Sequence, residues 1–173
     1  MCTVRFIADL HLGHTNMAKM RKFQDEFYHD EYIVDQWNSV VGKKDLTYIL
    51  GDVTMENSKN YYRLDSLNGR KIVILGNHDR PQDVPELLKY VERVSGMMKY
   101  KGVWLTHCPV HESELGYRVN KNIHGHIHEK LVTKDVYEWG YRIDSIPDER
   151  YVCVSCEHVD YKPKTLEELG VER

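Results

Sequence analysis

The side chains of this sequence that are best suited to bind metal ions fall in short clusters at the ends of apolar runs. The set comprises two carboxylates, four imidazoles and one amide, namely Asp9, His11, Asp52, Asn77, His107, His126 and His128. One divalent transition ion needs only three or four protein ligands when a coordination position is left open. Seven groups therefore fit two ions that share one carboxylate, and two ions about 3.5–4 Å apart are a known device for phosphoryl chemistry.

The mixture of nitrogen and oxygen ligands also limits which ions suit the cluster. It favours manganese, with iron, zinc, nickel or cobalt as alternatives. It would be unusual for calcium or magnesium alone, because those ions prefer oxygen ligands. We therefore expect two divalent metal ions as cofactors.

Five apolar segments have to bring these ligands together. Apolar and β-branched residues predict strands over 3–10, 45–53, 70–79 and 122–130, and a hairpin over 97–109 that turns at Lys101-Gly102. Ligands bind outside the carboxyl ends of strands in open α/β sheets, so these ends should converge. Residues two apart, such as Asp9 and His11 or His126 and His128, should leave the same face of an extended strand. Glycines at 51, 76 and 125 precede ligands, where the chain has to turn tightly or pass close to other backbone.

The remaining segments predict helices and short strands. Helices are expected over 15–23, 30–42, 61–69 and 84–96, with a terminal helical turn over 164–173. Asp30 is the candidate cap at the start of the second helix, and Gly42 is the candidate residue at its end. Segments 141–146 and 151–158 are expected to be short strands. The order of elements predicts an α/β sandwich of two sheets flanked by helices, in one domain over 1–173.

Composition limits the classes of function. The chain has 173 residues, 41% of them hydrophobic, and a formal net charge of −3. This charge argues against a basic surface, so nucleic acid is a possible partner but not a favoured one. No run approaches the roughly 20 apolar residues of a membrane span, and the N-terminus lacks a signal-peptide pattern. We therefore expect a cytoplasmic protein with no membrane partner, while its oligomeric state is left open.

Four cysteines, at 2, 108, 153 and 156, are too few for a disulfide framework. The pair in the stretch VCVSC invites a zinc or redox interpretation. If this stretch is a strand, however, Cys153 and Cys156 point to opposite faces. Buried thiols in a reducing compartment are the favoured interpretation.

Five short motifs carry a resemblance to a known family. They are DLH at 9–11, GD at 51–52, GNHD at 76–79, THCP at 106–109 and GHIH at 125–128. In this order they resemble the five motifs of the calcineurin-like metallophosphoesterases, and the length resembles that of small single-domain bacterial and phage members. The resemblance implies a four-layer αββα sandwich of two mixed β-sheets flanked by helices. It also implies an assignment of the ligands: Asp9, His11 and His128 to one ion, Asn77, His107 and His126 to the other, and Asp52 to both.

The resemblance further implies a reaction. A hydroxide held between the ions would attack phosphorus, and His78 would contact the phosphate and protonate the leaving oxygen as general acid. Asp79 would orient His78 and support its imidazolium form. Many relatives have a second acidic residue shortly after the GD motif. Here only Glu56 stands near that place, which leaves the subfamily open.

Two more residues are candidates for substrate binding, and each has an alternative. His14 could lie over the site or be an exposed loop residue. Arg80 could meet a substrate phosphate, since guanidinium suits that geometry, or it could be a solvated charge beside a helix. His124 is expected to hydrogen-bond near the ligands rather than to be one, and His111 is expected at the surface.

The expected function is hydrolysis of phosphate esters by a metal-dependent enzyme. Phosphodiesters or nucleotide-like substrates are favoured, because so short a chain has little material for a cap over a small monoester. Two alternatives stay open: a nuclease acting on DNA or RNA, and a metal-binding scaffold of the same fold. The lack of a basic stretch argues against the nuclease, and the retention of His78 and all seven ligands argues against the scaffold.

Overall fold

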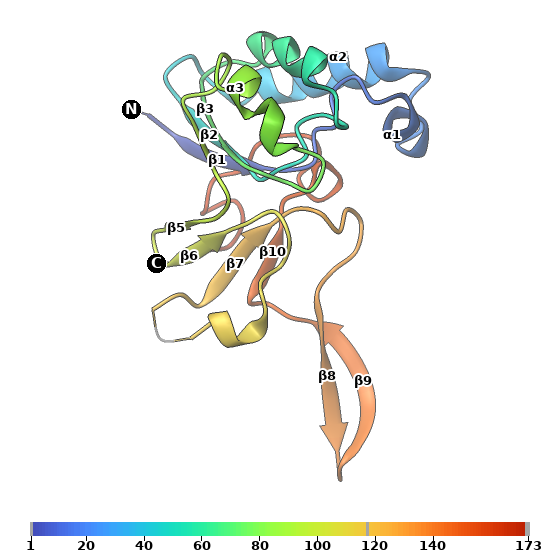
Figure 1. The fold of residues 1–173 in the computed structure, drawn as a ribbon. Helices are drawn as coiled ribbons and strands as arrows, with labels where there is room; N and C mark the ends of the chain where they lie inside the picture. The colour runs from blue at the N-terminus through green and yellow to red at the C-terminus, as the bar shows by residue number, and fades with distance from the viewer. Residues whose placement is uncertain (1, 117, 172–173) are drawn as a thin grey trace.

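The computed structural model of the chain describes residues 2–116 and 118–171 (Figure 1). Two four-stranded sheets and one separate two-stranded sheet make up the β-structure. The strands are β1 (Val4–Ile7), β2 (Leu46–Ile49), β3 (Arg70–Ile74), β4 (Arg93–Ser95), β5 (Met98–Tyr100), β6 (Val103–Leu105), β7 (Lys121–His124), β8 (Thr133–Glu138), β9 (Tyr141–Pro147) and β10 (Tyr151–Cys153). The α-helices are α1 (Thr15–Met20), α2 (Glu26–Asn38) and α3 (Val84–Leu87), and the 3-10 helices are η1 (Ser58–Ser66), η2 (Pro81–Asp83), η3 (Glu112–Glu114) and η4 (Cys156–His158).

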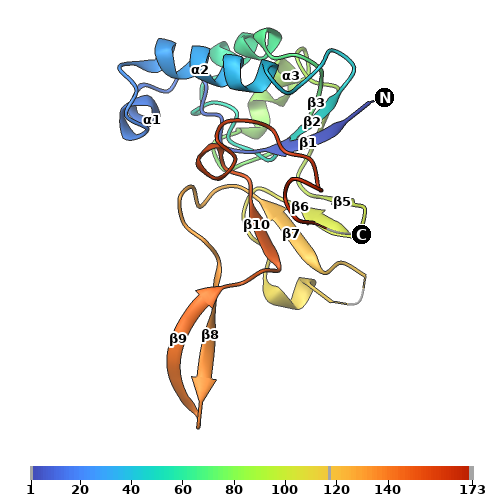
Figure 2. The same ribbon diagram turned by 180° about the vertical axis from the view of Figure 1, so that it is seen from behind.

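The first sheet has the order β1-β2-β3-β4, and all its neighbouring strands are parallel. Each connection within it crosses over through helical segments, as parallel pairing requires. These helices lie on the face of the sheet that is turned away from the second sheet (Figures 1 and 2). The residues toward the carboxyl ends of β1, β2 and β3 are buried and largely apolar, which is the pattern of a parallel sheet covered on both faces.

The second sheet has the order β10-β7-β6-β5, in which only the β5–β6 pair is antiparallel. The two sheets share one hydrophobic core, to which Phe6 and Ile49 contribute from one side and Leu105 and Ile123 from the other. The sheets also meet at a bridge between Ala8 and Ser155. The expected α/β architecture of sheets flanked by helices is therefore confirmed, although the first sheet is purely parallel rather than mixed.

Helix α2 begins earlier than the sequence suggests. Its cap is Asp25, whose Oδ1 accepts hydrogen bonds from the backbone N–H groups of Phe27 (2.9 Å) and Tyr28 (3.0 Å). Asp30, the expected cap, lies inside the helix and is buried. The helix ends at Asn38, before the expected end at Gly42. The prediction of Asp30 and Gly42 as boundaries was therefore wrong.

Two other helix predictions also differ from the structure. The helix expected over 84–96 is only the four residues of α3, and the chain then becomes strand β4. Pairing with β3 explains this change, because Val94 aligns with Val73 in the buried sheet. The terminal segment contains the expected helical turn, in which Leu169 N donates to the carbonyl of Thr165 (3.1 Å), but this turn is short compared with the expected range of 164–173. Residues 172–173 of that range lie outside the described part.

Strands β8 and β9 form a hairpin arm, defined here as residues 131–147, that projects from the body (Figures 1 and 2). Its turn is Trp139-Gly140, and both residues have positive φ angles of 51° and 83°. Two such residues suit the tight turn of a two-residue hairpin. The sequence predicted a strand in 141–146, which is confirmed, but it missed the partner strand β8. Within the described residues, every helix is too short or too polar to cross a lipid bilayer.

Candidate metal centre

The predicted ligands come together where the strands of both sheets end. Backbone hydrogen bonds join these ends directly: Asp9 N donates to the carbonyl of Gly51 (3.0 Å), and His11 N donates to that of Asp52 (3.0 Å). Gly125 N likewise donates to the carbonyl of His107 (2.9 Å). Segments that are about 18 to 42 residues apart in sequence are therefore held side by side, and the predicted convergence of strand ends is confirmed.

The backbone conformation that brings the predicted ligands together differs from the extended conformation that was expected. Five of the seven predicted ligands have a positive φ angle, namely Asp9 (59°), His11 (49°), Asp52 (53°), His126 (74°) and His128 (50°). Residues other than glycine adopt this left-handed conformation rarely, and such strain concentrates at functional sites. Asp9 and His11 therefore do not share a face through strand alternation, and neither do His126 and His128. The prediction that extended backbone presents each pair was wrong.

Close packing of the loops explains why positions 51 and 76 are glycine. A Cβ atom on Gly76 would collide with the carboxylate and backbone of Asp52, and one on Gly51 would collide with His107. Gly51 also has a φ of +88°, which an L side chain rarely adopts. The prediction that these positions serve close approach of backbone is confirmed.

One group of ligand atoms comprises Asp9, His11 and His128, with these atoms within 4.8 Å of one another. Asp9 and His11 are buried, and the rings of His11 and His128 stack with centroids 5.4 Å apart. The Asp9 carboxylate accepts hydrogen bonds from Ser155 Oγ (2.6 Å) and from the backbone N–H of His126 (3.0 Å). Such a group could hold a metal ion.

A second group comprises Asp9, Asp52 and His107, all buried, and a third comprises His107, Cys108 and His126. Asp52 Oδ2 lies 3.4 Å from His107 Nε2 and 3.8 Å from His11 Nε2, so one carboxylate stands between the two histidines. Cys108 was not predicted as a possible ligand, although this residue directly follows His107.

Asn77 completes this side of the centre. Its Oδ1 lies 2.8 Å from Nε2 of His107, while Nδ1 of His107 contacts the carbonyl of Leu50 at 2.8 Å. A proton on Nδ1 that is donated to Leu50 leaves Nε2 as the nitrogen that can bind a metal. Burial opposes the charged form of His107, but its contacts with Asp52 raise its pKa overall.

His11 is the side chain that fits a metal ion most clearly. Both of its ring nitrogens are buried, and neither has a hydrogen-bond partner in the described structure. Buried polar atoms are nearly always paired, so an unpaired imidazole calls for an explanation such as a bound ion. Burial lowers the pKa of His11 to about 3, which keeps the ring neutral with a free lone pair. Neutral imidazole is the form that binds metals.

A buried network that sequence analysis missed supports the first group. Arg21 donates from Nε to Glu157 Oε1 (2.8 Å) and from a terminal nitrogen to the backbone carbonyl of Asp9 (2.8 Å). Glu157 Oε1 in turn lies 3.2 Å from Nδ1 of His128. Burial opposes ionisation of Glu157, but its bonds with His128 and Arg21 lower its pKa to about 2. A charged carboxylate on Nδ1 leaves Nε2 of His128 free to bind a metal.

Replacement of Glu157 tests this network. The change Glu157→Gln should weaken metal binding by about 10–100-fold, the usual cost of losing a hydrogen-bond partner of a ligand. Titration calorimetry with Mn²⁺ measures the affinity, and Glu167→Gln, at an exposed position, is the matched control. Equal affinities of the Glu157→Gln variant and the unchanged chain would rule out this role for Glu157.

Asp79 does not contact the side chain it was expected to orient. Its carboxylate accepts hydrogen bonds from the backbone N–H groups of Asp52 (2.8 Å), Val53 (3.1 Å) and Gly76 (2.9 Å). It therefore fastens two ligand-bearing loops to each other. The carboxylate that faces His78 belongs to Glu56, with Oε1 lying 3.5 Å from Nδ1 of His78. The predicted pairing of Asp79 with His78 is corrected accordingly.

His78 itself lies beside the cluster. Its backbone N–H donates to Asp52 Oδ1 (3.0 Å), its Nε2 is 4.0 Å from Asp52 Oδ2, and its ring centroid is 5.8 Å from that of His11. One quarter of the side chain is exposed. This imidazole can therefore reach both the cluster and solvent.

The two candidate substrate-binding residues have different surroundings. The His14 ring lies 5.8 Å from that of His11, and its Nδ1 is buried without a hydrogen-bond partner in the described structure. Arg80 instead forms an ion pair with Asp83 at 2.7 Å. Of the other histidines, His124 is buried with Nδ1 near the Gly125 carbonyl (2.8 Å), and His111 is exposed.

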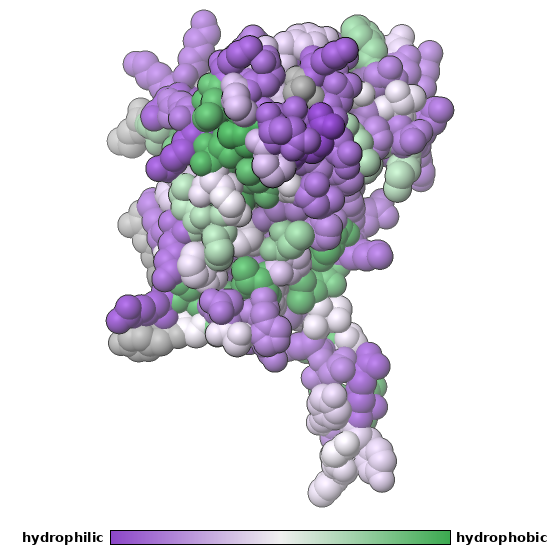
Figure 3. Space-filling view, viewed as in Figure 1, coloured by the Kyte–Doolittle hydropathy of each residue, from purple (hydrophilic) through white to green (hydrophobic). Residues whose placement is uncertain are grey.

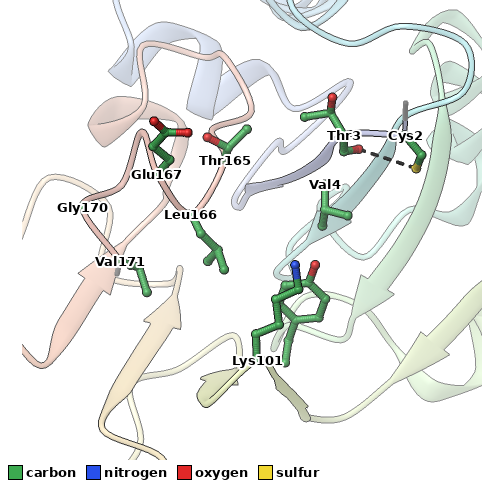
Figure 4. Close-up of a pocket in the computed structure, with 10 residues that line it drawn as sticks. Cys2, Thr3, Val4, Lys101, Thr165, Leu166, Glu167, Gly170 and Val171 are labelled. Atoms are coloured by element: carbon green, nitrogen blue, oxygen red, sulfur yellow. Dashed lines mark hydrogen bonds between the residues drawn. The ribbon is translucent and has the colours of Figure 1, made fainter. Parts of the chain in front are cut away.

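Two cavities differ in their position relative to the predicted ligands. One of about 480 Å³ borders the cluster and is lined by His126, His128, Met17 and Met20, among others. Another, of about 560 Å³, lies between the N-terminal strand and the C-terminal segment (Figure 4). Thr3 and Val4 form one wall of this second cavity, and none of the predicted ligands lines it. Only the first cavity adjoins the candidate centre.

Cys153 and Cys156 belong to none of the three groups of possible ligands found among the described residues. Cys153 and Cys156 are both buried and free, which confirms the expected buried thiols. The expected strand over 151–158 ends at Cys153, and η4 begins at Cys156.

The chain is similar in sequence or in fold to several known proteins. No protein-family model matches it. It is 29% identical over 175 residues to the uncharacterised protein MJ1445 of Methanocaldococcus jannaschii, covering 96% of this chain and 89% of that protein. The crystal structure of AQ665 from Aquifex aeolicus, a protein of unknown function, has the same fold, with a TM-score of 0.67, 23% identity and 98% of each chain covered.

The match to a phage protein is more decisive. The chain is 31% identical over 165 residues to the Gene 66 protein of Mycobacterium phage D29, and the alignment covers 76% of this chain and 81% of that protein. Identity at this level across most of both chains establishes common descent. The chain therefore belongs to the same family as the Gene 66 protein of phage D29.

Proposed function

We propose that this protein is a phosphoesterase that uses two divalent metal ions to hydrolyse phosphodiesters or nucleotide-like substrates. The observation that carries the proposal is the buried group of Asp9, His11, Asp52 and His107 around unpaired imidazole nitrogens. The order of the five motifs, which resembles that of the calcineurin-like metallophosphoesterases, supports the same conclusion. Manganese suits this set of nitrogen and oxygen ligands, and iron, zinc, nickel and cobalt are the alternatives.

In this proposal six of the predicted ligands each bind one ion, and the seventh binds both. Asp9, His11 and His128 hold one ion, and Asn77, His107 and His126 hold the other. Asp52, whose Oδ2 stands between His11 and His107, serves both. When bound, the two ions would neutralise charge on the phosphate and activate water.

The chain itself supplies the proton for the leaving group. His78 is fastened by its backbone to Asp52, so its imidazole stays beside the reacting phosphate. It donates a proton to the departing oxygen, a step that commonly contributes a factor of about 10²–10⁴. Glu56 Oε1, at 3.5 Å from Nδ1 of His78, is the carboxylate that faces this nitrogen. His14, whose ring lies 5.8 Å from that of His11, contacts the substrate.

Metal binding should weaken as the pH falls. Contacts with Asp52 raise the pKa of His107 against the effect of burial, and the bond to Glu157 raises that of His128. A metal ion binds only the neutral ring, so it has to displace these protons. Below the raised pKa values the affinity should drop by about tenfold per pH unit for each proton displaced. Calorimetry with Mn²⁺ at several pH values, in two buffers of different ionisation enthalpy, measures both the affinity and the protons released. An affinity that does not change with pH would contradict this prediction.

A reconstitution assay tests the function directly. The purified chain is stripped with a chelator, reloaded with Mn²⁺ and given bis(p-nitrophenyl) phosphate, p-nitrophenyl phosphate and single-stranded DNA at several salt concentrations. We expect turnover of the diester that depends on Mn²⁺ and exceeds that of the monoester. Cleavage of DNA that falls steeply with salt would favour the nuclease. A chain that binds Mn²⁺ but cleaves none of these esters would overturn the proposal in favour of a scaffold.

A further inference from the structure

The hairpin arm exposes large apolar side chains that have no function in the proposed reaction. Trp139 at its tip is 91% exposed, Tyr141 is 77% exposed and Tyr137 is 64% exposed. Ile143, Leu131 and Ile146 on the same arm are also exposed. Figure 3 shows the arm standing clear of the body, with a pale tip that is neither strongly hydrophilic nor strongly hydrophobic. Among the described residues, β8 and β9 pack extensively only on each other.

An arm of this kind is poorly stable by itself. A single two-stranded hairpin is marginal in water, because it has no further strand or helix over its apolar residues. Exposed apolar side chains that gather in one place mark an interaction surface, whereas scattered ones need no explanation. The arm therefore has the properties of an element that is covered when the protein is assembled.

The pairing of the strands divides the arm into two faces. The directly paired residues of one face, called here the docking face, are Lys134 with Ile146, Val136 with Asp144, and Glu138 with Tyr141. The opposite face contains Asp135, Tyr137 and Arg142, and its Asp135 and Arg142 form an ion pair at 2.8 Å. Lys134, Glu138 and Asp144 on the docking face form no ion pair within the described part of the chain. Only the docking face therefore offers unpaired charges beside its apolar residues.

We propose that the docking face packs against the same face of a second copy of this chain, with the two arms antiparallel about a twofold axis. Lys134 lies near the base of the arm and Glu138 near its tip, about 13 Å apart along the strand. An antiparallel arrangement then sets each Lys134 opposite Glu138 of the second copy, so two ion pairs form at once. The pairing of Lys134 with Glu138 is the self-complementarity that a twofold interface requires of one surface. Asp144, which is paired with Val136 midway between these two residues, lies near the axis and gains no ion pair.

The same arrangement covers Trp139 and Tyr141. The tip of one arm reaches the base of the other, so Trp139 packs near Leu131 and Ile146 of the second copy. Trp139 and Tyr141 present roughly 400 Å² of surface per chain. The neighbouring apolar and charged side chains add to this area, and a standard stable interface buries about 800 Å² per partner. Tyrosine and tryptophan are also the residues that contribute most to such interfaces.

Charge favours a second copy over nucleic acid as the occupant. The arm has three acidic residues, Asp135, Glu138 and Asp144, against two basic ones, Lys134 and Arg142. Binding of a nucleic-acid backbone requires a positive surface, which this arm lacks. A mixed arrangement of both signs suits pairing with an identical surface.

Sedimentation velocity of the full chain over a range of concentrations tests the proposal. We expect a dimer, and we expect Tyr141→Ser to raise its dissociation constant by at least about tenfold. Tyr137→Ser, at a similarly exposed tyrosine on the opposite face, is the matched control and should leave the dimer intact. A chain that is monomeric at about 100 μM, or equal effects of the two tyrosine changes, would overturn the proposal.

A charge exchange tests the antiparallel geometry separately. Lys134→Glu and Glu138→Lys should each weaken the dimer, because each sets like charges opposite each other. The double variant Lys134→Glu/Glu138→Lys restores both ion pairs and should restore the dimer. Failure of the double variant to recover association would exclude the proposed pairing. Circular dichroism verifies folding of each variant, and the comparison of single and double variants holds even if one single variant folds poorly.

Discussion

Asp52→Asn is expected to abolish binding of at least one metal ion and with it nearly all phosphoesterase activity. The change removes one negative charge from the carboxylate between His11 and His107, whose nitrogens lie 3.8 and 3.4 Å from Asp52 Oδ2. The amide oxygen can still accept the backbone N–H of His78, so the loop should stay in place. Loss of a hydrogen-bond partner of a ligand already costs about 10–100-fold in affinity, and loss of a shared ligand should cost more than about 100-fold.

Metal analysis and calorimetry measure this effect, and the exposed Asp35→Asn on helix α2 is the matched control. Circular dichroism separates loss of metal from loss of fold. An Asp52→Asn variant that binds two ions with unchanged affinity would show that this carboxylate is not a shared ligand.

His78→Ala is expected to separate catalysis from metal binding. None of the groups of possible ligands includes His78, so the metal content of the variant should equal that of the unchanged chain. Without the proton donor, turnover of an aryl phosphodiester should fall by about 10²–10⁴-fold. The loss should be larger for substrates whose leaving group is a poor one, because these depend more on protonation.

Steady-state kinetics with two diesters of different leaving-group pKa measures this difference. His111→Ala, at an exposed histidine, is the control variant. Full turnover by His78→Ala with both diesters would refute the role of His78 as general acid.

The candidate ligands could be predicted from the sequence, but the backbone conformation that presents them could not. Asp9, His11, Asp52, His107, His126 and His128 could be found because each follows an apolar strand, and parallel strands end at one edge of a sheet. The left-handed φ angles of Asp9 and His11 could not be found in this way. That conformation depends on hydrogen bonds to Gly51 and Asp52, which come from another strand far along the chain.

Supporting residues were hardest to predict because their partners are distant in sequence. Glu157 and Arg21 are 136 residues apart and meet only when the segment after β10 folds against α1. Asp79 was assigned to His78 because the two are neighbours, yet its carboxylate is directed to the backbone of Asp52 and Gly76. Proximity in sequence gave the wrong partner for Asp79, because its carboxylate accepts hydrogen bonds from three backbone N–H groups and does not contact His78.

The local spacing of apolar residues also gave wrong predictions where pairing with a distant strand decides the secondary structure. Residues 84–96 have apolar residues at helical spacing, but β3 offers an unpaired edge that Val94 and its neighbours complete as β4. The hairpin arm was only half predicted because its turn contains Trp139 instead of the asparagine or aspartate that usually signals such a turn.

In the proposed function, these strand ends build a centre for two divalent ions. Anomalous diffraction from crystals soaked in Mn²⁺ tests it most directly. We predict two anomalous peaks, one bounded by Asp9, His11 and His128 and the other by Asn77, His107 and His126, with Asp52 in contact with both. Well-diffracting soaked crystals with no anomalous peak among these side chains would contradict the account.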